Sequence, residues 1–174
     1  MDGPIPFGSQ GYFALLGVLL VTRGADFLST WVATPNLVLE ANPIAKALRW
    51  RWGVPVNVLM CLLFSFWPLP AIIIATTSAL VAARNFQVAW LMRSMGEEAY
   101  RSWMVDRLEQ TPFMLFLGCL FGQTLLLAGV GGILAAFSRW QVVPLGVGIG
   151  LVAYALTILV FTLISLWRRR RPLQ

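Results

Sequence analysis

The sequence predicts an all-α, polytopic membrane protein with five membrane-spanning helices, an outside N-terminus and an inside C-terminus. Of its 174 residues, 59% are hydrophobic and only 11% are charged, whereas a soluble domain carries about a quarter charged residues. The mean hydropathy is +0.77, and the charges gather at the ends of long apolar runs. This composition excludes a water-soluble globule, and it excludes a disordered chain because disorder requires low hydrophobicity.

The first predicted span covers residues 11–31, about the length that crosses the bilayer core as a helix. No Lys or Arg precedes it, and Arg23 and Asp26 lie within it. Both features differ from a cleavable signal peptide, so we expect a retained helix. A polar stretch follows, in which Asn42-Pro43 predicts an N-cap and the first position of the next helix.

Residues 54–92 are mostly apolar and too many for one span, so they predict a hairpin of two helices. They are interrupted by Trp67-Pro68-Leu69-Pro70, and prolines in series end a helix. We expect the two spans at about 54–67 and 71–92. Residues 44–53 are expected to extend the first of them obliquely along the membrane interface.

The charged segment after residue 93 predicts an amphipathic interfacial helix before the fourth span. Glu97 and Arg101 are four residues apart, a spacing at which opposite charges stabilise a helix. Apolar side chains recur every three to four residues at Tyr100, Trp103, Met104 and Leu108. The last two spans are expected at about 112–137 and 142–167, so that residues 1–174 form a single membrane domain.

The basic residues predict the orientation. Of the thirteen Lys and Arg residues, Arg23 and Arg84 lie within spans and Arg139 lies in a segment assigned to the outside. The remaining ten lie in segments assigned to the inside, as the positive-inside rule predicts for a multi-pass protein of the cell (cytoplasmic or inner) membrane. These ten are Lys46, Arg49, Arg51, Arg93, Arg101, Arg107, Arg168, Arg169, Arg170 and Arg171.

Polar residues from separate segments are predicted to meet at one depth, in the inner half of the membrane. On the first helix, Arg23, Asp26 and Thr30 share a face, and we expect Arg23 and Asp26 to interact with Arg84 of the third helix. Polar groups within spans usually face a partner or a cavity. The predicted cluster consists of Arg23, Asp26, Thr30, Glu40, Asn42, Asn57, Arg84 and Asn85.

Three interpretations of this cluster stay open: a structural ion-pair network, a site for a solute or ion, or a catalytic site. In the last case Asp26 and Glu40 would act as acid and base. Since the outer connections are short and almost uncharged, we expect the cluster to open toward the cytoplasm through the loop that carries Glu40.

A resemblance rests on this same region. The residues Asp26-x-x-x-Thr30 are followed by Glu40-x-Asn42-Pro43, and Asn85 lies near the end of the third helix. This order resembles an uncharacterised family of small prokaryotic integral membrane proteins, a domain of unknown function with a D-x3-T … E-x-N-P signature. The resemblance covers about residues 11–93. It implies a membrane location and a candidate site but no reaction, because the family has no assigned activity.

The chain contains no histidine, which excludes Ser-His-Asp and Cys-His catalysis and histidine-ligated zinc or haem. We expect no cofactor, no metal and no nucleic-acid partner. Three classes of function remain. The first is a non-catalytic accessory, structural or regulatory membrane component. The second is a small transporter or channel-like protein that uses the polar cluster, and the third is an enzyme acting on a lipid-phase substrate through Asp26 and Glu40.

Two features predict partners. The four arginines 168–171 are expected to attract anionic lipid. Glycines in the last two spans predict close helix packing, either between these spans or against a second subunit through Gly118, Gly122 and Gly129. Gln123 lies mid-span, and we expect it to find a partner inside the protein. Cys61 and Cys119 are expected to be small buried residues with no redox role.

Overall fold

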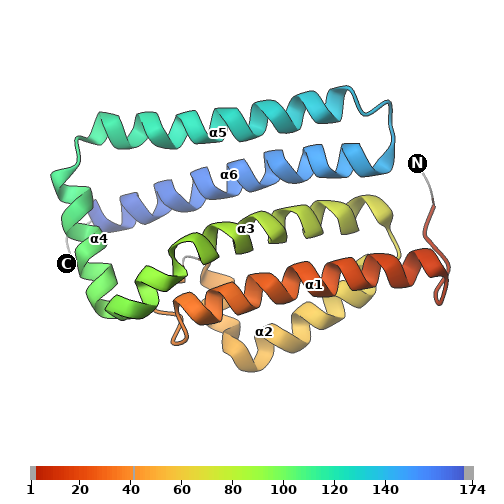
Figure 1. Cartoon of the computed structure of the whole chain (residues 1–174), viewed down its shortest axis with the longest axis horizontal. Coiled ribbons are helices and arrows are strands. Elements are labelled where there is room, and N and C mark those ends of the chain that lie inside the picture. The colour runs from red at the N-terminus through yellow and green to blue at the C-terminus, as the bar shows by residue number, and fades with distance from the viewer. Residues whose placement is uncertain (1–2, 41, 171–174) are drawn as a thin grey trace.

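The computed structural model describes residues 3–40 and 42–170, with side chains to residue 164, and in this part of the chain helices are joined by short connections, without a strand. The all-α prediction is confirmed. Long helices lie side by side along one axis, while α4 crosses one end of them (Figure 1). The helices are α1 (Gln10–Ala33), α2 (Pro43–Phe64), α3 (Pro68–Met95), α4 (Glu97–Gln110), α5 (Phe113–Ala136) and α6 (Val142–Arg170).

Four helices in the described chain are long and apolar enough to cross a membrane, namely α1, α3, α5 and residues 142–164 of α6. This is the architecture of a multi-pass membrane protein. The predicted second span, α2, is not among them. Its first half carries Lys46, Arg49 and Arg51, and its backbone is kinked at Arg49, which has a φ of 52°.

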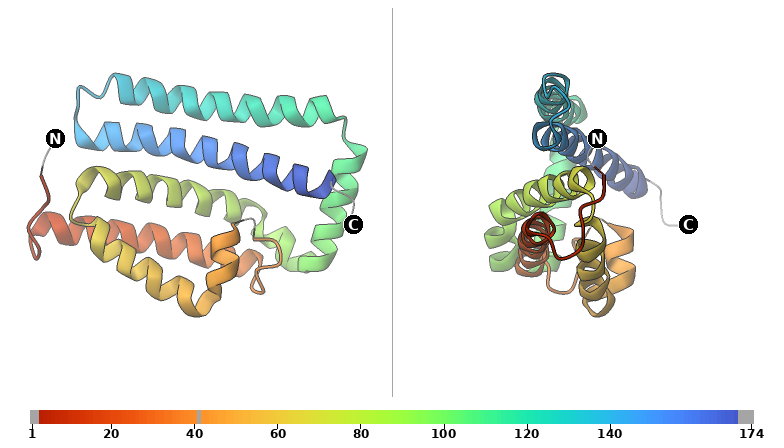
Figure 2. Two further views of the ribbon diagram at one scale, coloured as in Figure 1. Left: turned by 180° about the vertical axis from the view of Figure 1, so that it is seen from behind. Right: turned by 90° about the vertical axis from the view of Figure 1, so that its right-hand side faces the viewer.

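The helices form a stack in the order α5, α6, α3, with α1 and α2 together at the far side (Figure 2). The closest partners are α1 with α3, α5 with α6, and α3 with α6. Because the long helices alternate in direction, the N-terminal end of α1 and the C-terminal end of α6 lie at opposite ends of the stack (Figure 1).

Local signals account for the start of α2 and correct the start of α3. Asn42 caps α2 by accepting a hydrogen bond from the Ile44 N–H at 2.9 Å, and Pro43 occupies the first turn, as predicted. The second helix ends at Phe64, and α3 already begins at Pro68. The prediction that both prolines lie in the connection was wrong, because a proline in the first helical turn lacks only an N–H that has no helical acceptor.

Glycines let α6 approach two neighbours at once. A Cβ on Gly148 would lie 2.6 Å from the Gly131 carbonyl oxygen of α5, whereas one on Gly146 or Gly150 would meet Ile72 or Thr76 of α3 at 2.8 and 2.7 Å. The packing prediction for the last two spans therefore holds at Gly131 and Gly148.

The glycines expected to offer a docking face lie elsewhere on α5. Gly118, Gly122 and Gly129 have open space beside them. Cys61 is buried as expected, but Cys119 is exposed. This difference arises because α5 lies at the edge of the stack (Figure 2).

Candidate functional site

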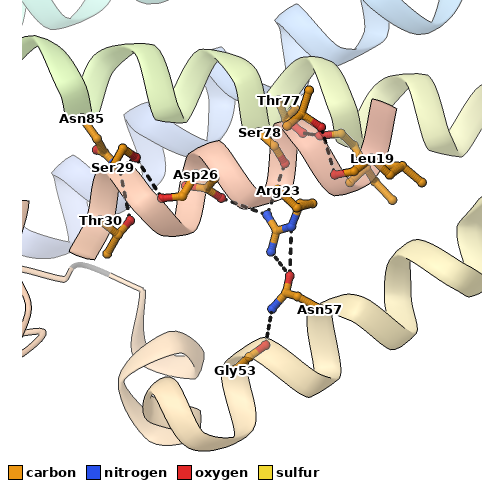
Figure 3. Close-up of polar contacts among 12 residues, drawn as sticks. Leu19, Arg23, Asp26, Ser29, Thr30, Gly53, Asn57, Thr77, Ser78 and Asn85 are labelled. Atoms are coloured by element: carbon orange, nitrogen blue, oxygen red, sulfur yellow. Dashed lines mark hydrogen bonds and ion pairs between the residues drawn. The ribbon is translucent and has the colours of Figure 1, made fainter. Parts of the chain in front are cut away.

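Arg23 lies at the centre of a polar network that joins three helices (Figure 3). Its Nη1 donates to Asp26 Oδ2 at 3.0 Å and to Ser78 Oγ of α3 at 3.2 Å. Its Nε donates to Asn57 Oδ1 of α2 at 2.9 Å, and its Nη2 donates to the same oxygen. The predicted ion pair of Arg23 and Asp26 is confirmed, and it is the only ion pair among the residues that the structure describes.

The positions of these side chains follow from helix geometry. Arg23 and Asp26 are three residues apart on α1 and so share a face. Asn57 is oriented by its own Nδ2, which donates to the Gly53 carbonyl one turn earlier at 2.8 Å. The guanidinium also lies 5.8 Å from the ring centre of Phe27, a cation–π distance.

A second polar contact joins α1 and α3 about two turns beyond Arg23 and Ser78 (Figure 3). Asn85 Nδ2 donates to Ser29 Oγ and to Thr30 Oγ1, both at 3.3 Å. The Ser29 hydroxyl in turn donates to the Asp26 carbonyl oxygen at 2.8 Å. The backbone of Asp26 therefore connects this contact to the Arg23 network.

Glu40 and Asn42 lie in the connection between α1 and α2. Glu40 Oε1 accepts a hydrogen bond from the Asn42 N–H at 2.8 Å, while the Asn42 side chain caps α2. The carboxylates of Glu40 and Asp26 are close enough to act on each other electrostatically. No hydrogen bond joins Glu40 to the Arg23 network among the residues that the structure describes.

Arg84 does not join the predicted cluster. Its side chain is exposed, and its guanidinium lies beside the hydroxyl of the buried Tyr154 on α6. The expectation of an Arg23–Asp26–Arg84 interaction was wrong on this point. The position of Arg84 along α3 predicts its depth in the membrane but not the side of the helix on which it lies. Arg84 is on the side of α3 that faces α6, whereas its neighbour Asn85 faces α1.

Sequence reasoning missed Glu97, which binds the connection between α1 and α2. Its carboxylate accepts hydrogen bonds from Thr34 Oγ1 at 2.7 Å, from the Asn36 and Val38 N–H groups at 2.9 and 3.0 Å, and from Asn36 Nδ2 at 3.0 Å. Burial raises the pKa of Glu97, but these hydrogen bonds outweigh it and hold the pKa below its ordinary value. The predicted helical pairing with Arg101 does not form, since Glu97 turns toward this connection.

Ser78 was missed as well. It is a buried hydroxyl on α3, and a serine in an apolar run is too common a feature to indicate that it meets Arg23. One signal in the sequence is that Ser78 lies seven residues before Asn85. Residues with this spacing lie on the same face of a helix, so Ser78 shares the face of α3 that carries Asn85.

A partly open cavity of about 260 Å³ lies against the Arg23 network. Its polar lining comes from Arg23, Asn57, Thr77 and Ser78, and its apolar lining from Leu19, Met60, Phe64 and Ile74, together with Cys61. No group of three or more His, Cys, Asp or Glu side chains within the described ranges could hold a metal ion. The donors around this cavity suit an uncharged acceptor, since Asp26 already neutralises Arg23.

Compared with protein-family models, with curated proteins and with solved structures, the chain shows no match. The resemblance to the family with the D-x3-T … E-x-N-P signature therefore stays a prediction.

Proposed function

We propose that the chain is a five-span integral membrane protein of a prokaryotic cytoplasmic membrane that works as a non-catalytic accessory or regulatory component. In this proposal α1, α2, α3, α5 and α6 cross the bilayer, and α4 lies along its inner surface. The D-x3-T … E-x-N-P residues belong to the polar network and its flanking connection. They would then be a structural signature of this fold.

The contacts of α2 with α1 support a fifth span. At one end, the Tyr12 hydroxyl donates to the Leu62 carbonyl at 3.2 Å, and the Ile5 N–H donates to the Phe66 carbonyl at 2.8 Å. At the other end, Trp50 Nε1 donates to the Pro35 carbonyl at 2.8 Å. Since α2 reaches both ends of α1, a bilayer that accommodates α1 also accommodates the apolar half of α2.

The arrangement of basic residues supports the orientation. The end of the stack crossed by α4 also holds the connection between α1 and α2 (Figure 1). Lys46, Arg93, Arg101 and Arg107 belong to segments at this end, whereas Arg139 lies at the opposite end, in the connection between α5 and α6. Arg171, the last of the four terminal arginines, lies outside the described residues.

The nearly complete hydrogen bonding of Arg23 is the single observation that carries the non-catalytic proposal. Of its five N–H groups, four donate to Asp26, Asn57 and Ser78. A partly buried ion pair whose N–H groups are mostly hydrogen-bonded to neighbouring helices favours one arrangement of those helices. A pathway for charged solutes would instead need a charge that is free to interact with the solute.

The partners that we propose are anionic lipid, at the arginines from 168 onward, and a second copy of the chain, at the outer face of α5. Gly118, Gly122 and Gly129 would allow close approach there. Gln123 supports this pairing, because it is exposed on a candidate span and an amide in lipid needs a hydrogen-bonding partner.

Native mass spectrometry of the chain, purified in mild detergent from membranes of its own host, tests the proposed role. We expect a second membrane chain, or a second copy, at a fixed ratio. The isolated chain in liposomes should neither conduct small solutes nor convert lipids. Solute flux or lipid turnover that is lost in Asp26→Asn, but kept in the exposed control Asp106→Asn on α4, would overturn the non-catalytic proposal.

A further inference from the structure

The cavity between α1, α2 and α3 separates polar from apolar lining along the helix axes. Because α2 runs opposite to α1 and α3, Asn57 lies at the level of Arg23 and Ser78 (Figure 3). On α2, Phe64 lies seven residues after Asn57. On α1 and α3, Leu19 and Ile74 lie four residues before Arg23 and Ser78. Because the directions of the helices are opposite, all three apolar side chains lie toward the same end of the cavity. The cavity therefore has a polar end and an apolar end.

The polar end offers hydrogen-bond donors and no net charge. Asp26 neutralises Arg23, and the side-chain oxygen Oδ1 of Asn57 accepts hydrogen bonds from two N–H groups of Arg23. Within the described chain, the Ser78 hydroxyl hydrogen and the second hydrogen on Arg23 Nη2 have no acceptor. Such a set recognises an acceptor oxygen on an uncharged molecule, because a carboxylate or phosphate would compete with Asp26 for the same guanidinium.

We propose that this cavity binds a small, uncharged, membrane-soluble molecule that carries a carbonyl oxygen on an apolar ring, such as an aryl ketone or a quinone. The carbonyl accepts from Ser78 and Arg23, and the ring lies against Leu19, Phe64 and Ile74. The volume of about 260 Å³ is adequate, because a dry cavity of about 150 Å³ already holds benzene. The proposal rests on membrane insertion, since the ligand would arrive from the bilayer.

Benzophenone is a suitable probe, because it combines a carbonyl with apolar rings and inserts into nearby C–H bonds under near-ultraviolet light. One ring fits the cavity and the other can lie toward its open side. Met60 lines the cavity and is 41% exposed, whereas Met114 on α5 is 78% exposed and lies away from it. Simple partitioning into lipid would therefore favour Met114, and binding in the cavity favours Met60.

The experiment irradiates the full-length protein in phospholipid nanodiscs with benzophenone and maps the adducts by peptide mass spectrometry. We expect more adduct on Met60 than on Met114. Fluorenone in excess should suppress the Met60 adduct, and fluorene, which lacks the oxygen, should compete about three- to tenfold less well, the range expected for one hydrogen bond. A protein that fails to enter nanodiscs would count against the membrane proposal and not against the cavity.

Matched variants test the recognition itself. Ser78→Ala should reduce the Met60 adduct about three- to tenfold, whereas Ser94→Ala, at the far end of α3, should leave it unchanged. Cys61→Leu narrows the cavity and should reduce the Met60 adduct. Cys119→Leu makes the same change outside the cavity and should leave the adduct unchanged. Equal or greater labelling of Met114 in the wild type would overturn the site, and full Met60 labelling in Ser78→Ala would overturn recognition of the carbonyl by this donor.

Discussion

Arg23 and Asp26 form an ion pair of 3.0 Å on one face of α1, with 28% of the Arg23 side chain and 16% of the Asp26 side chain exposed. The pair does not stand alone, because Arg23 also binds Asn57 of α2 and Ser78 of α3. An ion pair within α1 therefore also holds α2 and α3 in position against α1. This coupling makes the consequences of removing either charge testable.

Removing Asp26 alone should destabilise the fold more than removing both charges. Asp26→Asn leaves Arg23 without its counter-ion, and we expect a loss of about 2–3 kcal/mol, below the roughly 3–5 kcal/mol for a fully buried pair. Asp26→Asn combined with Arg23→Gln should lose less, because neither charge is then unpaired. Unfolding in mixed micelles of mild detergent and dodecyl sulfate measures both. Equal losses would show that the pair is not coupled.

The orientation can be measured with an impermeant thiol reagent. In a background of Cys61→Ala and Cys119→Ala, single cysteines at Arg139 and Arg107 should react from opposite sides of the membrane, with Arg139 outside. The physical reason is the concentration of basic residues at the end that holds α4. Labelling of both cysteines from one side would contradict the five-span arrangement.

The carboxylate of Glu97 should hold the connection between α1 and α2 in place. Glu97→Gln keeps the size but presents N–H groups to donors, so we expect a loss of about 1–2 kcal/mol and faster proteolysis between residues 34 and 42. Its exposed neighbour provides the matched control, since Glu98→Gln removes the same charge from the same turn of α4. A similar effect of both variants would attribute the loss to charge alone.

The same contact should depend on pH in a defined direction. Hydrogen bonding holds the pKa of Glu97 below its ordinary value, so the ionised form is favoured by folding. The stabilisation is complete above about pH 4.3, the unfolded glutamate pKa, and is lost as the pH falls through the lower folded value. The rate of pepsin cleavage in this connection, taken relative to the rate in Glu97→Gln at the same pH, should therefore increase as the pH is lowered from about 4.3, because the variant lacks the titrating carboxylate.

Two adjacent glycines of α5 should respond in opposite ways to alanine. Gly131→Ala places a Cβ 2.6 Å from the Gly148 carbonyl oxygen, and we expect a loss of about 1–3 kcal/mol from overpacking. Gly132→Ala meets nothing within 4 Å and should be neutral or stabilising by up to about 1 kcal/mol, because alanine is the better helix former. The midpoint of thermal unfolding in detergent measures both, and equal shifts would show that α5 and α6 do not approach as closely as described.

The sequence by itself determined the class of protein and the ends of several helices. Apolar length predicted α1, α3, α5 and α6 as candidate spans, because crossing the bilayer core demands a long apolar helix whatever surrounds it. The Asn42-Pro43 cap was predictable for a similar reason, since it satisfies orphan N–H groups of its own helix. The Arg23–Asp26 pair also followed from spacing along one helix. In each of these cases the interaction is complete within a short stretch of chain.

The tertiary structure alone decided which way each helix turns about its own axis. Hydropathy predicts how deep a residue lies, and it brought Arg23, Arg84 and Asn85 to similar depth, but only the packing of α3 between α1 and α6 directs Asn85 to Ser29 and Arg84 to Tyr154. The partners of Arg23 on α2 and α3 and the turn of Glu97 toward the connection between α1 and α2 depend on neighbours in the same way. The rotation of a helix is determined by the surfaces packed against it, and these surfaces come from residues distant in the sequence.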